Sequence, residues 1–248
     1  MSPPPARLDE NWSDWLDDLR ELLKFDRNRI ATAVPSWPNE DQRAGCVYWL
    51  YGRMGVNVNS LVSLDHPIHF QASVMLARSL FELVVDLKLL NAGIIENAVE
   101  KIVAFNRIEL LRAAEKIVRF TEKFPEASLK SEIQKKLIQE SKAEWSKQKG
   151  QYWPGRSRVN HWSGYDLTER VEKVGLPFEE WHARYYAEFS WYTHAGIMGL
   201  PGTSTDLWKV RQAQAFHLAL ACYNEALRIF VQEFRLPALR GEFPDVWL

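Results

Sequence analysis

Apolar residues along this chain recur three and four positions apart in almost every segment that lies between breaks. From Trp12 to Phe25 they share one face of a helix, and Asn11 or Ser13 stands where a helix cap is expected. The same spacing predicts further helices over residues 40–64, 68–90, 94–124, 126–149, 166–175, 176–196 and 205–234. No segment keeps the alternation of a strand. The pattern therefore predicts an all-α fold, a single helical bundle of about seven to eight helices.

Proline and glycine mark the breaks between these helices. Asp65-His66-Pro67 is a strong helix start, and Gly93 suits the left-handed position that ends the same helix. The two long helices after it are separated at Phe124-Pro125, which predicts a long antiparallel helical hairpin.

The chain is predicted to form one domain. Residues 1–10 are proline-rich and read as a disordered lead. Residues 11–236 form the single helical-bundle domain. Residues 237–248 are expected to be an irregular C-terminal tail whose apolar side chains pack on the body.

Two charged residues stand out in the most apolar helix. Arg78 and Glu82 are four apart, so they face the same side of a helix that is otherwise apolar nearly all round. The pair is therefore expected to be buried or to line a cleft. It either fixes the packing of the bundle as an ion pair or takes part in chemistry, and both interpretations stay open.

A second polar set follows later in the chain. Tyr186, Ser190 and His194 are four apart and form one stripe of a predicted helix. Polar groups beside so many aromatic residues need hydrogen-bond partners, and Arg78 and Glu82 are the expected ones. The opposite interpretation is that His194 is a core histidine bonded to Glu82 or Ser190.

The segment from Gly150 to Gly164 is predicted to be a long loop. It carries Arg156 and Arg158, followed by His161 and Trp162. Long loops that mix basic, aromatic and hydrogen-bonding residues are often functional, although ordinary packing also explains the tryptophan.

Charge and composition narrow the setting. The net charge is −1, but residues 101–158 carry 14 Lys/Arg against 7 Asp/Glu, or +7. This block suits a phosphate backbone, although a solvated helix pair with its lysines outward is the more common cause of such a charge run. Charges interrupt the apolar run from Ile68 to Leu90, and no signal-peptide pattern begins the chain, so no membrane association and a cytoplasmic location are expected. Without a Gly-rich phosphate loop, a CxxC pair or a His-Glu-x-x-His motif, no cofactor and no metal are expected.

Three motifs in order carry a resemblance to a known family. They are Arg78-x-x-x-Glu82, His161-Trp162-Ser163-Gly164, and Tyr186-x-x-x-Ser190-x-x-x-His194. Over roughly residues 65–200, this set resembles a bacterial all-helical family of unknown function. The resemblance implies that Arg78, Glu82, Trp162, Tyr186, Ser190 and His194 meet in space.

A looser resemblance is to the HEPN superfamily, helical bundles that include RNA-cleaving toxins and defence effectors. Their signature is an arginine, four to six residues and then a histidine, which the segments Arg156–His161 and Arg211–His217 match. The resemblance implies metal-independent cleavage of RNA.

Such cleavage needs a base for the 2′-hydroxyl, an acid for the leaving oxygen and a cation beside the phosphate. The residues predicted to be catalytic are His194, Glu82, Arg78, Ser190 and His161. Those predicted to bind substrate are Arg156, Arg158, Trp162 and Tyr186.

Two other functions remain open from the sequence. The chain is alternatively a non-catalytic helical interaction or regulatory module, similar to an antitoxin, in which the polar cluster serves only the fold. A hydrolase that uses Glu82 and His194 is weaker, because too few carboxylates converge for a two-metal site. The expected partners are RNA or a protein, and a homodimer is a further expectation.

Overall fold

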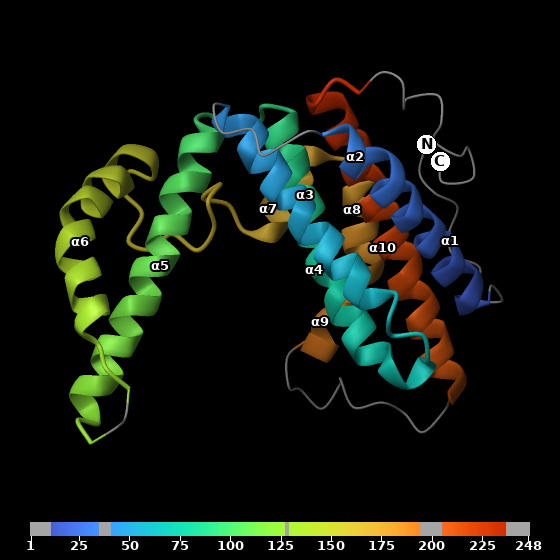
Figure 1. Ribbon diagram of the computed structural model, residues 1–248, viewed down its shortest axis with the longest axis horizontal. Coiled ribbons are helices and arrows are strands. Elements are labelled where there is room, and N and C mark those ends of the chain that lie inside the picture. Colours follow the sequence, from blue (N-terminus) through green and yellow to red (C-terminus); the bar gives the residue numbers. More distant parts are fainter. Residues whose placement is uncertain (1–10, 35–40, 127–128, 194–204, 237–248) are drawn as a thin grey trace. The chain divides into compact units, whose positions relative to one another are not determined.

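Residues 11–34, 41–126, 129–193 and 205–236 are described by the computed structural model, and every regular element within them is helical (Figure 1). Eight of these α-helices are seven residues or longer, which confirms the all-α fold. The predicted lead (1–10) and tail (237–248) lie outside the described residues, as does His194.

The chain contains two compact units. The first comprises residues 1–94 and 167–248, and the second comprises residues 95–166. The stretch 11–236, predicted as a single domain, thus holds two separately packed groups of helices. Each is described by itself below.

The core of the first unit is built from long helices. They are α1 (Trp12–Phe25), α3 (Gln42–Leu61), α4 (Phe70–Asn91) and α10 (Thr205–Glu233). Helix α10 packs along α4, α1 and α3. Buried residues occur on every side of α4, which explains why its sequence is apolar nearly all round.

Shorter elements complete the first unit. They are α2 (Ala31–Ala33), the 3₁₀ turn η2 (Pro67–His69), α7 (Leu167–Val174), α8 (Phe178–Trp181), α9 (Ala187–Thr193) and the two π-helical turns η1 (Asp26–Ile30) and η3 (His182–Tyr186). The turn η1 lies where the sequence predicts a connecting loop, and η3 lies within the predicted helix over residues 176–196.

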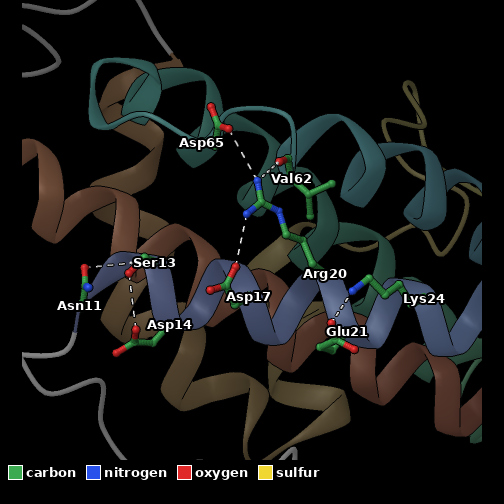
Figure 2. Close-up of polar contacts among 9 residues, drawn as sticks. All are labelled: Asn11, Ser13, Asp14, Asp17, Arg20, Glu21, Lys24, Val62 and Asp65. Carbon is green, nitrogen blue, oxygen red and sulfur yellow. Dashed lines mark hydrogen bonds and ion pairs between the residues drawn. The ribbon is translucent and has the colours of Figure 1, made fainter.

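Helix α1 begins as its sequence predicts. The Asn11 side chain accepts a hydrogen bond from the backbone N–H of Ser13 (3.4 Å). Later in the helix, Arg20 donates to the Val62 carbonyl oxygen (3.5 Å) and lies 3.6 Å from an Asp65 carboxylate oxygen. Figure 2 shows these contacts, which tie α1 to the chain that follows α3.

A buried carboxylate anchors the turn η1. Tyr51 and Tyr223 each donate a hydroxyl to one oxygen of Asp26, at 2.6 Å. Burial raises the pKa of Asp26, while the two hydroxyls oppose that rise. Both carboxylate oxygens thus accept a hydrogen bond from another helix, as in a structural anchor.

The second unit contains the predicted hairpin. Helices α5 (Ala98–Lys123) and α6 (Glu132–Tyr152) run antiparallel against each other (Figure 1). A small core joins α5 to the loop that follows α6, and it consists of Ala104, Ile108, Trp153 and Val159. Helix α6 itself contains no fully buried residue.

Within the part of the chain that the structure describes, no helix is both long and apolar enough to cross a membrane.

Candidate functional site

The polar residues of α4 make the contact that their spacing predicts. Arg78 Nε donates to Glu82 Oε1 at 3.1 Å, one helical turn along. Their side chains are 15% and 38% exposed, so the pair lies at the edge of the core rather than in its middle. A half-exposed carboxylate beside a nearly buried guanidinium keeps water access while the arginine is held in place.

Tyr186 brings the second polar set to the same place. Its hydroxyl accepts a hydrogen bond from Arg78 Nη2 (2.6 Å) and donates one to Glu82 Oε1 (2.9 Å). The Arg78 guanidinium carbon also lies 4.6 Å from the centre of the tyrosine ring. The three side chains therefore close a hydrogen-bonded triangle between α4 and η3, which we call the triad.

The electrostatics of the triad favour a neutral tyrosine. Burial raises the pKa of the Tyr186 phenol, and the Glu82 carboxylate raises that pKa further, whereas Arg78 lowers it. The phenol is therefore a hydrogen-bond donor near neutral pH. Arg78 Nη1 is buried and has no partner among the described residues, so one guanidinium edge still has donor capacity.

A residue that the sequence analysis missed packs on the triad. The His182 ring stacks on Tyr186, with 5.0 Å between ring centres, and on Phe81, with 6.2 Å. His182 stands four positions before Tyr186, so the spacing of the predicted stripe extends back by one step. This four-residue spacing is the sequence feature that could have identified His182.

Ser190 lies one turn beyond the triad on α9. Its hydroxyl donates to the Tyr186 carbonyl oxygen at 2.7 Å. This bond engages the proton of the hydroxyl inside the helix, as serine commonly does. His194, the next member of the stripe, falls outside the described residues.

The predicted loop residues belong to the second unit. His161 Nδ1 lies 2.8 Å from Ser163 Oγ and accepts the Ser163 backbone N–H at 3.2 Å. Because Nδ1 accepts that N–H, the tautomer with its proton on Nε2 fits this turn. The turn orders the motif His161-Trp162-Ser163-Gly164.

Trp162 is 5% exposed, and Trp153, also buried, donates its indole N–H to the Trp162 carbonyl oxygen at 3.0 Å. Gly164 adopts φ +82°, and a Cβ there would lie 3.1 Å from the Trp153 ring. These rings form the core of the loop, and base stacking by Trp162 would require its ring to be uncovered.

Arg156 and Arg158 are exposed on this loop. Nearby backbone carbonyls are held by other cations, since Arg112 donates to the Val159 oxygen and Lys149 to the Ser157 oxygen, each at 2.6 Å. The loop backbone is thus fixed, while two guanidinium groups face solvent, where they can meet phosphate.

The second arginine-to-histidine match lies in the interior of the first unit. His217 is 4% exposed, and Arg211 pairs with Glu188 and Gln214. Neither the buried His217 nor the paired Arg211 therefore offers a phosphate site.

A buried ion pair joins α7 to α4, where Arg170 donates to Asp86 at 2.6 Å. Asp86 has no periodic partner in sequence, so only the fold reveals this contact.

No three His, Cys, Asp or Glu side chains of the described ranges converge as metal ligands. The triad contains one carboxylate and one guanidinium, which suits an anionic or proton-transferring ligand better than a cation.

Comparison with known proteins gives one family. The chain matches a family of unknown function, DUF5677, over residues 47–205. This match spans more than half of the chain, so the chain belongs to that family, as the three ordered motifs predicted. The matched region contains the whole triad. No curated protein and no solved structure matches the chain.

Proposed function

We propose that the chain is an HEPN-like ribonuclease, a toxin or defence effector, and that the triad is its catalytic centre. The observation that carries the proposal is the triangle of Arg78, Glu82 and Tyr186. It fixes a guanidinium that has one buried donor without a partner among the described residues beside a carboxylate that remains 38% exposed. Phosphodiester cleavage uses a positioned cation and a proton acceptor of this kind.

The roles follow from the chemistry of each group. Glu82 accepts the proton of the RNA 2′-hydroxyl, and the 2′-oxygen attacks the phosphorus. The bond from phosphorus to the 5′-oxygen then breaks. His194 as imidazolium gives its proton to that leaving oxygen. The products are a 2′,3′-cyclic phosphate and a 5′-hydroxyl end, and exchange with water restores both side chains.

Arg78 and Tyr186 stabilise the developing charge and do not transfer a proton. The guanidinium binds the phosphoryl oxygens as negative charge develops, and Tyr186 holds the guanidinium in register. On the second unit, the exposed Arg156 and Arg158 bind the RNA backbone, which carries no sequence information. Cleavage is therefore expected to depend little on base sequence and strongly on salt.

The test is cleavage of labelled single-stranded RNA by the purified full chain in the presence of a chelator. Glu82→Gln removes the proton acceptor but keeps the shape, and we expect a loss of about 10²–10⁴-fold in rate. Glu115→Gln is the matched control, because Glu115 is also 38% exposed and also pairs at i,i+4, with Arg119. His194→Ala is expected to slow cleavage by a similar factor. Intact RNA with wild type, or equal rates for wild type and Glu82→Gln, would show the proposal to be wrong.

A second candidate function is the non-catalytic regulatory module. It is favoured by the hydrogen bonds that Arg78, Glu82 and Tyr186 already make to one another, as purely structural groups do. The cleavage assay separates the two functions, because neither wild type nor Glu82→Gln cleaves RNA if the triad is only structural. In that case Glu82→Gln should only lower the unfolding temperature.

A further inference from the structure

Within the second unit, the described residues leave apolar side chains of the hairpin exposed. A groove of about 320 Å³ runs between α5 and α6, and Leu110 and Leu137 face each other across it. Leu110 is 62% exposed and Leu137 is 38% exposed. Helix α6, 21 residues long, has no buried residue at all. Most helices in proteins owe their stability to a packed face, so this one is incomplete as it stands.

The apolar surface continues along the hairpin beyond the groove. Phe124, the C-cap residue that ends α5, is 39% exposed. Ile133, one turn before Leu137 on α6, is 80% exposed. With about 200 Å² for a fully exposed large side chain, these four residues leave roughly 450 Å² of apolar surface in water.

Charges on the groove match a copy of the same groove. Arg107 lines it and makes no ion pair or hydrogen bond with the described residues. Glu140 and Glu144 line it too: Lys136 lies 3.8 Å from Glu140, and Gln148 donates a hydrogen bond to Glu144 at 2.9 Å. One surface thus holds an unpaired cation and two exposed carboxylates. A two-fold contact between copies makes each Arg107–glutamate pair twice.

We propose that the chain forms a homodimer in which the α5–α6 grooves of two copies pack together as a four-helix arrangement. The area supports this occupant. A standard interface buries about 800 Å² per partner, of which about 57% is apolar, or roughly 450 Å². The exposed apolar side chains of the hairpin supply that amount. The charges that line the groove are of both signs, so a copy can meet them even though residues 101–158 as a whole carry a net +7.

The test is the mass of the full chain in solution, by light scattering after size exclusion and by sedimentation, over a range of concentrations. We expect about twice the monomer mass of 28.9 kDa for wild type. The double variant Leu110→Glu/Ile133→Glu should be monomeric, with the dissociation constant raised at least about 30-fold per buried anchor removed. Ile68→Glu is the matched control, since Ile68 is 59% exposed and belongs to the first unit, and it should remain dimeric.

A charge exchange tests the register of the contact. Arg107→Glu should weaken the dimer, and adding Glu140→Arg and Glu144→Arg to it should restore association, because the signs are then merely swapped. All of these side chains are exposed, so circular dichroism should show the fold unchanged. A monomeric wild type overturns the proposal, and so does a Leu110→Glu/Ile133→Glu variant that stays dimeric.

Discussion

Acidification should weaken the first unit through His217, a buried histidine on α10. Its Nδ1 lies 3.2 Å from the Tyr185 hydroxyl, and the Trp15 ring packs edge-on against it at 4.6 Å between centres. Burial, with a smaller contribution from the charge of Arg184, lowers the pKa of His217 from 6.5 to about 4. The folded protein therefore keeps this ring neutral in mildly acidic solution.

The sign and size of the effect follow from linkage. Below pH 6.5 the unfolded chain binds a proton at this histidine, whereas the folded chain binds it only below pH 4. Between these values the unfolded state holds more protons, so the free energy of unfolding falls as the pH falls. The loss is about 2 kcal/mol between pH 7 and pH 5, and it levels off at roughly 3 kcal/mol below pH 4.

The assay is urea unfolding followed by far-UV circular dichroism at pH 7 and pH 5. His217→Asn removes the titration while keeping a polar atom near Tyr185. This variant should lose about 2 kcal/mol less than wild type over that interval. The control is His69→Asn, at an exposed position, which should behave like wild type. Asp26, whose pKa is raised, acts in the opposite direction in all three proteins and cancels in the comparison. Equal pH sensitivity of wild type and His217→Asn would refute the reasoning.

Three further predictions concern stability and are checked by the same unfolding experiment. Arg170→Met leaves Asp86 buried without its ion-pair partner and should cost about 3–5 kcal/mol, whereas adding Asp86→Leu should recover most of the loss. Tyr186→Phe removes an acceptor from Arg78 and a donor from Glu82, and should cost about 1–3 kcal/mol. Gly164→Ala places a Cβ at φ +82° against the tryptophan core of the loop and should cost at least about 1–2 kcal/mol. Losses under about 0.5 kcal/mol would contradict each.

Helix positions were predictable from local chemistry. The cap at Asn11 and the left-handed Gly93 depend on residues within one turn of the boundary, and both are found where predicted. Pro67 begins the 3₁₀ turn η2, and α4 itself begins three residues later at Phe70. The final helix was predicted from 205 to 234 and runs from Thr205 to Glu233. The π-helical turns escaped prediction, because an extra residue in a helical turn leaves the apolar spacing almost unchanged.

The site was predictable in part. Arg78, Glu82 and Tyr186 meet as expected, because charges on an apolar helix must find partners and few polar residues were available. The pairing of Asp86 with Arg170 and the burial of His217 were not predictable, since both arise between helices that are distant in sequence. The exposed stripe of α5 and α6 looks in sequence like any core-facing stripe, and only the fold shows it uncovered.

The central claim is that Glu82 takes the proton from an RNA 2′-hydroxyl while Arg78 binds the phosphate. The most direct measurement compares the full chain on two substrates of identical sequence, one all RNA and one with 2′-deoxy sugars, with the product ends identified by mass spectrometry. We expect cleavage of the RNA alone, leaving 2′,3′-cyclic phosphate ends, and loss of that cleavage in Glu82→Gln but not in Glu115→Gln. Failure to cleave RNA, or cleavage of the 2′-deoxy strand at a similar rate, would contradict it.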